Sequence, residues 1–478
     1  MKTFKKFEKQ MLLAIMIVAV GLSGAWAADY KKVDSITLLK YKKPIDDPRP
    51  LGKELTYKKV LSPEVYAKLT WDVPTMRKAW ADVVGFSAPG VVGKISPEIK
   101  PGKYTYKDVE SNKALKELVI PYFREHFIKP AGPPFIGNFT EFTIIPTRQL
   151  YYQLPVAQAT KKNQGKTKLN DKGYIVDSSY ESGIPFPRPS GNYKAQQVVY
   201  NWIKRYWDSE GTDSMGIFKG FNKSLNLDFD GLIEIKNLRL SGRVIIPPFG
   251  YFDQRAKERK EGTATLLTYQ APRDQYGTAL NIVTFESADQ VDSMSVFVNS
   301  LRRVRKMSAT DTQDALGGQD IIYDDNGGFG KLCSNRNPYK LEIVAEREYL
   351  VPVTTDTSIY YSSKGMELKN VEMERRPVYV IKMIQQDKNY VYSYRIAYFD
   401  RENFLLYHIE NYDQKGRLYR TNTSIQTFIP EMGMTTERVV ISRDHVDLHS
   451  STALPFITPI VNVKRGDVSL EGMIKRGK

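Results

Sequence analysis

Residues Glu374–Thr421 read ERRPVYVIKMIQQDKNYVYSYRIAYFDRENFLLYHIENYDQKGRLYRT. This stretch predicts four antiparallel strands, because runs rich in Val, Ile, Tyr and Phe alternate with short polar segments. The three turns are expected at 386–389, 400–403 and 413–416, where Asp, Asn, Lys or Gly dominate. The rest of the chain is organised around this meander.

Side chains alternate between the two faces of a strand, so the second strand has an aromatic face and a mixed face. The aromatic face is expected to carry Tyr390, Tyr392, Tyr394, Ile396 and Tyr398. Such a face must be covered, either by the rest of the core or by an apolar ligand. The candidate wall of a ligand cavity, with ordinary core packing as the alternative, is Tyr379, Ile381, Met383, Tyr390, Tyr392 and Tyr394.

The N-terminus predicts export. Four lysines precede the apolar run Met11–Val20, and Ala25-Trp26-Ala27 forms a small-x-small cleavage site, so residues 1–27 are expected to be a signal peptide. No cysteine directly follows the apolar run, so we do not expect a lipoprotein signal. We expect a periplasmic protein, soluble or peripherally associated with the envelope. The net charge of +16 is spread along the chain, and export argues against nucleic acid as its partner.

Domain organisation follows from composition. Residues 28–57 are charged and contain proline, which predicts an extended arm. Residues 58–452 are expected to form one large domain, and 453–478 a tail.

Helices and strands are predicted from periodicity. Helical spacing appears at 62–81 and, most clearly, at 195–206. Pro155 is expected to end a strand over 147–157. The further expected strands are 216–223, 225–235, 235–246, 262–270, 278–286, 292–306, 339–352, 423–430 and 437–446. This pattern is typical of a large antiparallel sheet or open barrel. A loop over 309–338 interrupts it, and loops of that length are often functional.

Enzyme motifs are absent from the sequence. There is no G-x-S-x-G, P-loop, G-x-G-x-x-G, H-E-x-x-H or C-x-x-C pattern, and we expect neither an enzyme nor a cofactor. His445 and His449 are weak candidates for a shared metal site. In an extended segment they would lie about 13 Å apart, too far to bind one ion. Cys333 is the only cysteine and has no nearby histidine, which indicates a structural thiol.

Arg302 and Arg303 lie in the basic segment LRRVRK. Guanidinium groups bind carboxylate and phosphate bidentately, so these arginines are candidates for the polar rim of a cavity. The alternative is a solvated strand face paired with acids on neighbouring strands.

Several motifs in order carry a family resemblance: SGIPFP before a Trp-bearing helix, RVIIPPFG, LRRVRK with a downstream YDDNGGF, EREYLVPV, and the meander. From about Lys53 to His449 the chain resembles the domain-of-unknown-function 1329 family, whose members are periplasmic and similar to the outer-membrane lipoprotein-sorting (Lol-type) carriers. Where that family often has a proline-glycine turn before its arginines, this chain has Val298-Asn299-Ser300-Leu301.

The resemblance implies a mainly β fold with some α. The expected architecture is a large curved antiparallel sheet, an incomplete barrel, with helices covering its concave face. It also implies a cavity for a hydrophobic or lipid-like ligand and work beside a resistance-nodulation-division (RND) type exporter and an outer-membrane partner. Two other functions stay open: a structural or assembly protein of the envelope without a ligand, and a hydrolase with an unrecognised site.

Overall fold

The computed structural model describes residues 57–206, 209–307, 311–315, 319–331, 333–355, 359–361 and 367–476. The expected signal peptide, and the expected arm except Tyr57, lie outside the described residues. Among the helices of these ranges, none has the length and apolarity required to cross a membrane.

One 15-stranded sheet dominates the described part of the chain. Its strands are β1 (Gly102–Thr105), β2 (Glu141–Ile145), β3 (Gly211–Phe221), β4 (Leu227–Arg239), β5 (Glu261–Ala271), β6 (Ala279–Phe285), β7 (Ser293–Val298), β8 (Arg303–Lys306), β9 (Tyr339–Val353), β12 (Glu372–Gln385), β13 (Tyr394–Asp400), β14 (Leu406–Tyr412), β15 (Leu418–Ile429), β16 (Met434–Asp444) and β17 (His449–Pro459). A separate ribbon pairs β10 (Tyr360–Tyr361) with β11 (Leu368–Lys369).

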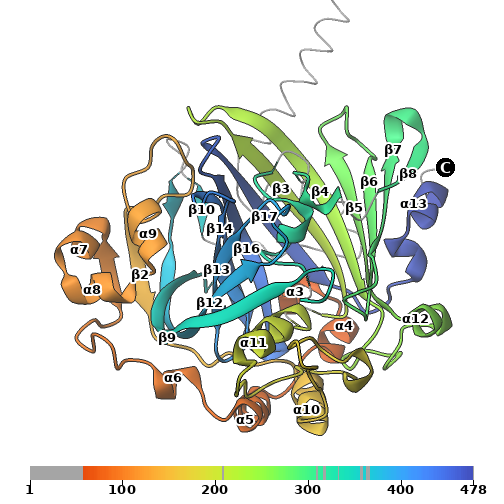
Figure 1. Ribbon diagram of the computed structural model, residues 1–478, viewed down its shortest axis with the longest axis horizontal. Coiled ribbons are helices and arrows are strands. Elements are labelled where there is room, and N and C mark those ends of the chain that lie inside the picture. Colours follow the sequence, from red (N-terminus) through yellow and green to blue (C-terminus); the bar gives the residue numbers. More distant parts are fainter. Residues whose placement is uncertain are drawn as a thin grey trace, which may run out of the picture.

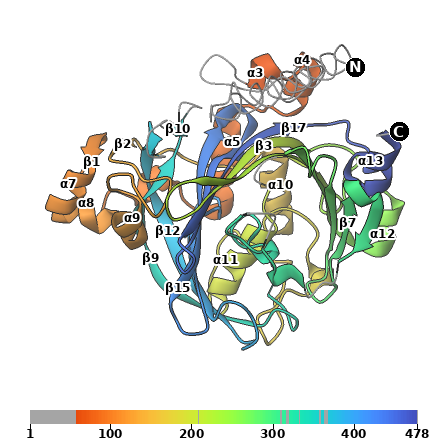
Figure 2. The same ribbon diagram turned by 90° about the horizontal axis from the view of Figure 1, so that it is seen from above.

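The sheet curls strongly but does not close. Its order is β1-β2-β12-β13-β14-β15-β16-β17-β3-β4-β5-β6-β7-β8, with β9 beside β12 and β15. Pairing is antiparallel except between β2 and β12 and at one β9–β15 contact. Seen from above, the strands follow an open curve around helices and loops (Figure 2). The expected incomplete barrel is thus confirmed.

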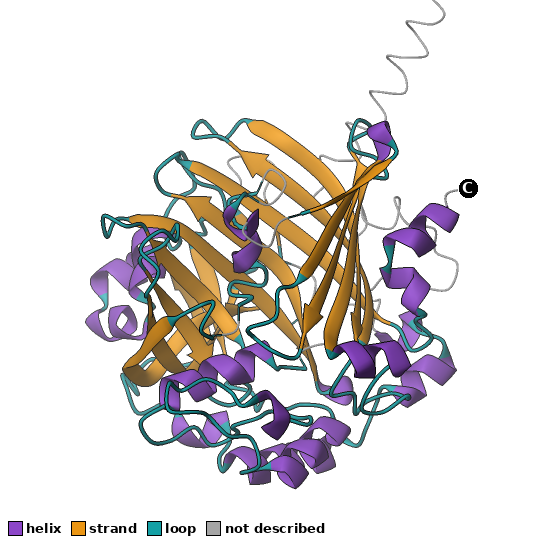
Figure 3. Cartoon of the chain, turned by 45° about the vertical axis from the view of Figure 1, so that its right-hand side comes forward, coloured by secondary structure: helices purple, strands orange, loops and turns teal. Residues whose placement is uncertain are grey.

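The helices lie inside the curve and around it (Figure 1). They are α3 (Tyr57–Val60), α4 (Pro63–Lys68), α5 (Val73–Val84), α6 (Ala88–Val91), α7 (Tyr106–Ser111), α8 (Lys113–Leu118), α9 (Pro121–His126), α10 (Leu154–Asn163), α11 (Lys194–Ile203), α12 (Gln254–Arg259) and α13 (Leu470–Arg476). Figure 3 shows helices gathered at one end of the sheet and on its outer side. Ser62 caps α4, because its side chain accepts a hydrogen bond from the Val65 amide at the start of this helix.

Both faces of the meander are buried, and alternation along β12 shows how. Tyr379, Ile381 and Met383 join an apolar cluster with residues of α5, α10 and α11 on the concave side. Val378 and Val380 join a second cluster with α7, α8 and α9 on the opposite side. Burial on two faces explains why these strands are apolar in both alternating sets.

The four predicted strands are confirmed as β12–β15, but the second one begins later than expected. β13 starts at Tyr394, so Tyr390 and Tyr392 belong to the preceding loop. Their hydroxyl groups donate hydrogen bonds to Asp324 and Asp325. Because these partners lie outside the sheet, both tyrosines are held in the loop instead of extending the strand.

Five other predictions of extended chain were wrong in detail. In place of the expected strands 225–235 and 235–246 there is the single strand β4, which ends at Arg239, so residues 240–246 lie outside it. Residues 292–306 form the hairpin β7–β8, whose turn occupies 299–302. In 147–157 the helix α10 begins at Leu154, because Pro155 fits the first helical turn, where its missing N–H costs nothing. Residues 445–448 are a turn between β16 and β17 rather than extended chain.

The C-terminal residues are part of the fold. β17 runs from His449 to Pro459 and pairs with β16 and β3, so it crosses the expected boundary between residues 452 and 453. In α13, Leu470 packs against Leu266 of β5 and Ala279 of β6. The strand β17 therefore connects the meander to the β3–β8 half of the sheet.

Candidate functional site: a polar cavity on the concave side

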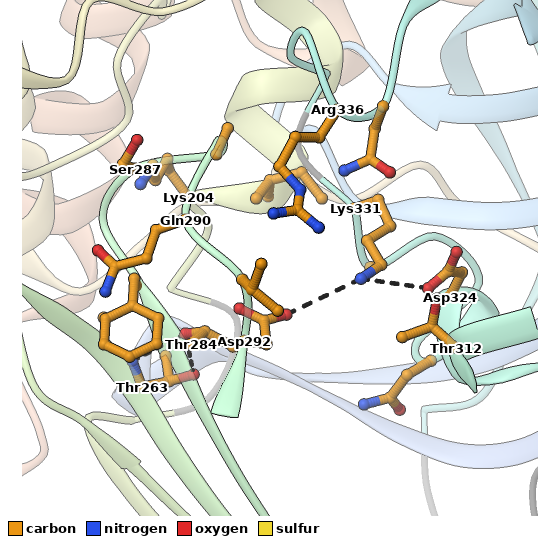
Figure 4. A pocket seen from close by; sticks show the side chains of 18 of the residues that line it. Lys204, Thr263, Thr284, Ser287, Gln290, Asp292, Thr312, Asp324, Lys331 and Arg336 are labelled. Carbon is orange, nitrogen blue, oxygen red and sulfur yellow. Dashed lines mark hydrogen bonds and ion pairs between the residues drawn. The ribbon is translucent and has the colours of Figure 1, made fainter. Parts of the chain in front are cut away.

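A cavity of about 430 Å³ lies between strands β4–β7, the end of α11 and the segment that precedes β9. Ligand pockets in proteins measure roughly 300–1,000 Å³, so this volume suits a small molecule or one end of a larger one. Figure 4 shows its side chains, which are largely polar and charged.

Lysine and aspartate side chains interact across this cavity. Nζ of Lys331 lies 3.3 Å from Oδ1 of Asp324 and 3.9 Å from Oδ2 of Asp292 (Figure 4). Burial raises the pKa of the Asp292 carboxyl, and Lys331 and Arg336 oppose that rise. Lys331 therefore holds two carboxylates of different segments together.

A buried network fixes the loop that forms one wall. Nη1 of Arg395 lies 2.5 Å from Oδ1 of Asp325, and the Tyr392 hydroxyl donates to Oδ2 of the same carboxylate at 2.8 Å. The Tyr390 hydroxyl donates to Asp324 Oδ2 at 2.7 Å. Indole Nε1 of Trp202 in α11 donates to the Phe329 carbonyl at 2.7 Å. The described part of this loop is thus anchored to β13, to the β12–β13 loop and to α11.

Lys204 stands at the end of α11 and lines the cavity. Its ammonium lies 5.0 Å from the centre of the Tyr180 ring. Burial, reinforced by the positive charge of Arg239, lowers the pKa of Lys204 to about 8. Placing such a cation at an enclosed surface costs desolvation energy, which an anionic ligand can offset.

The predicted site residues fall into four places. Tyr390 lines the cavity, and Tyr392 packs beside it. The buried residues Tyr379, Ile381 and Met383 belong to the concave-side cluster with the helices, outside the cavity lining. Tyr394 stacks on Tyr412 at 4.3 Å between ring centres. Arg302 ends the β7–β8 turn and Arg303 begins β8, and both are exposed and do not line the cavity.

Sequence patterns did not single out Lys204, Asp292 or Arg336. The one available signal was Lys204 itself, a cation that directly follows the apolar stripe of α11. Asp292 and Arg336 stand in no recognisable sequence pattern. They reach the cavity only through the long-range pairing of strands, which the local sequence does not reveal.

The cysteine and the two histidines considered as reactive or metal-binding residues have structural roles. Cys333 is buried, and burial raises the pKa of its thiol to about 12. His445 is bonded to the Tyr122 hydroxyl at 3.0 Å, and His449 lies between Asp320 and Asp228. Within the described ranges no group of three or more His, Cys, Asp or Glu residues is suited to hold a metal ion.

An open, curved sheet with helices and a lined cavity on its concave side defines an incomplete β-barrel. The family model described as "Protein of unknown function (DUF1329)" matches residues 139–454, well over half of the chain. The chain belongs to this family. No curated protein matches it.

Three solved structures are similar to this chain. A putative outer membrane lipoprotein-sorting protein domain from Vibrio parahaemolyticus is 15% identical, with a TM-score of 0.42, over 59% of this chain and 98% of that one. A DUF1329 family protein from Desulfovibrio piger is 14% identical, with a TM-score of 0.40, over 55% and 92%. A LolA superfamily protein from Nitrosomonas europaea is 13% identical, with a TM-score of 0.35, over 58% and 98%.

Proposed function

We propose that this chain is a periplasmic carrier that binds a hydrophobic or lipid-like ligand without covalent chemistry. The observation that carries the proposal is the cavity of about 430 Å³ on the concave side of an incomplete barrel. Ligand sites are concave and combine apolar side chains with placed polar groups. The lining here includes Ile203, Phe285, Val291 and Met294 beside its charged residues. The basic, apolar and small-x-small pattern of residues 1–27 supports export.

The proposed partners are an RND-type exporter and an outer-membrane component, in lipid or lipoprotein trafficking. A carrier of this kind receives its ligand at one membrane and releases it at another. The excess of Lys and Arg over Asp and Glu along the sequence favours contact with anionic membrane surfaces.

A second candidate function is a structural or assembly role in the envelope without a ligand. The packing of Tyr379, Ile381 and Met383 in one cluster with α5, α10 and α11 favours it, because side chains fill that part of the concave face.

Uptake of a neutral hydrophobic dye, N-phenyl-1-naphthylamine, by the delipidated mature protein separates these functions. The carrier proposal predicts saturable uptake with one site per chain. Ala288→Trp, which places a large ring in the cavity lining, should reduce uptake at least tenfold. Glu110→Trp, on the exposed surface of α7, is the matched control and should leave uptake unchanged. No saturable uptake, or uptake insensitive to Ala288→Trp, contradicts the proposal.

A further inference from the structure

The cavity lining carries more cations than carboxylates. The cationic side chains are Lys204, Arg205, Arg239, Lys331 and Arg336, and the carboxylates are Asp292, Asp324 and Asp387. Lys331 lies within ion-pair distance of both Asp292 and Asp324 and therefore offsets part of their charge. The remaining lining is positive.

Two of these cations come from separate elements and have no ion-pair partner among the described residues. Lys204 is half-buried after α11, and its ammonium lies 5.0 Å from the centre of the Tyr180 ring. Asp177 and Glu286 act on its charge from a distance, but no carboxylate of the described ranges comes within 4 Å of it. Arg336 is exposed in the segment before β9, and no carboxylate of the described ranges comes within 4 Å of its guanidinium. Figure 4 shows both side chains at the cavity, with Arg336 near Lys331. A cation that is partly removed from water and has no carboxylate in ion-pair contact favours an anion at that place.

The lining also includes apolar side chains. They are Ile203, Phe285, Ala288, Val291 and Met294. Val291 is 38% exposed, whereas Phe285 and Met294 are buried. A lining that combines cations with exposed and buried apolar side chains suits a molecule with an alkyl part and a charged end.

We infer that this cavity binds the acidic head group of an amphiphile, a carboxylate or a phosphate, and that Lys204 and Arg336 recognise it. The inference rests on the proposed carrier function and names the class of its ligand. Arginine forms paired hydrogen bonds with carboxylate or phosphate oxygens, and lysine supplies a point charge. The alkyl part of the ligand lies along Ile203, Phe285 and Val291.

Isothermal titration calorimetry of the delipidated mature protein tests the inference. The four probes, used at concentrations below the critical micelle concentration, are decanoate, decyl phosphate, 1-decanol and inorganic phosphate. The two anionic amphiphiles should bind at least tenfold more tightly than 1-decanol, and inorganic phosphate should bind more weakly than decyl phosphate. Lys204→Gln should weaken both anionic amphiphiles at least tenfold and leave 1-decanol unchanged. Lys204→Arg should retain the preference for anions, and the exposed Lys103→Gln, on β1, is the charge-matched control.

The outcomes are distinguishable. Equal affinity for decanoate and 1-decanol, or equal behaviour of Lys204→Gln and Lys103→Gln, overturns the inference and leaves the carrier function intact. Inorganic phosphate that binds as tightly as decyl phosphate makes the site one for a free anion and also overturns it. If none of the three amphiphiles binds, the carrier function itself fails. Should Lys204→Gln not fold, the exposed Arg336→Gln gives the same test, with an expected loss of at least threefold for the anions alone.

Discussion

The guanidinium of Arg395 and the carboxylate of Asp325 form a buried ion pair, 2.5 Å from Nη1 to Oδ1, across 70 residues of sequence. Arg395 lies on β13, and Asp325 lies in the long loop before β9. Tyr392 donates a second hydrogen bond to Asp325. This pair fixes one wall of the cavity to the meander.

Asp325→Ala should therefore be strongly destabilising. The change leaves the Arg395 charge buried without its carboxylate, and breaking a buried pair in this way costs about 3–5 kcal/mol. Urea unfolding followed by tryptophan fluorescence measures the loss. Asp447→Ala, at an exposed position in the β16–β17 turn, is the control and should cost under about 0.5 kcal/mol. Similar midpoints for the two variants would show that the pair does not hold the loop.

The same pair shows what the sequence could and could not predict. The strands β12–β15 were predictable, because alternating Val, Ile and Tyr between polar turns is a local signal. The position of Tyr390 and Tyr392 in the loop before β13 was not predictable, because their partners Asp324 and Asp325 belong to a segment that is distant in sequence. The cavity could not be predicted either, because its cations come from three separate parts of the chain: the end of α11, β4 and the 331–336 segment.

The position of the concave face was also unpredictable from alternation alone. Both faces of β12 and β13 are apolar, and the mixed side of β13, with Ala397 and Phe399, packs in the concave-side cluster with the helices. Tyr398, from the aromatic side, packs in the opposite cluster. Only the placement of the helices distinguishes the two sides.

Ile381→Ala tests the assignment of that residue to the core. Ile381 is fully buried in the concave-side cluster with α11, so truncation should cost about 2–5 kcal/mol through lost burial and a cavity. Chemical denaturation measures this loss. Val446→Ala, at a residue that is 44% exposed, should change the free energy of unfolding by under about 0.5 kcal/mol. A near-neutral Ile381→Ala would place Ile381 at an open ligand wall instead.

Gly183 explains part of the SGIPFP motif. Its φ of +79° suits glycine, and a Cβ there would lie 2.6 Å from the Thr160 backbone nitrogen of α10. Gly191 has a similar φ of +70° but open space around it. Both alanine variants carry backbone strain, and Gly183→Ala adds the clash, so it should be about 1–3 kcal/mol less stable than Gly191→Ala. Equal thermal unfolding of the two variants would contradict the close approach of the motif to α10.

His449 should make stability depend on pH. Its Nδ1–H donates to Asp320 at 2.8 Å and its Nε2–H to Asp228 at 3.1 Å, and these bonds, chiefly the one to Asp320, raise the pKa of His449 to about 9. Burial raises the pKa of the Asp320 carboxyl, and the bond to His449 opposes that rise. Because the folded pKa of the imidazole exceeds its unfolded value near 6.5, the stabilisation is complete below pH 6.5 and is lost as the pH rises through about 9.

His449→Gln measures this contribution. We expect the variant to be less stable than the native chain by about 1–2 kcal/mol at pH 6, with the deficit shrinking toward pH 10. Urea unfolding at pH 6, 8 and 10 gives the profile. A deficit that stays constant over this range would show that the imidazole is not charged in the folded state.

Native mass spectrometry of the protein purified from the cells that make it, with organic extraction of bound molecules, tests the carrier function most directly. The carrier account predicts an added mass of one amphiphile per chain, released on extraction and bearing a carboxylate or phosphate. A clean ligand-free mass, together with no uptake of N-phenyl-1-naphthylamine by the same preparation, would contradict the account and favour a structural role in the envelope.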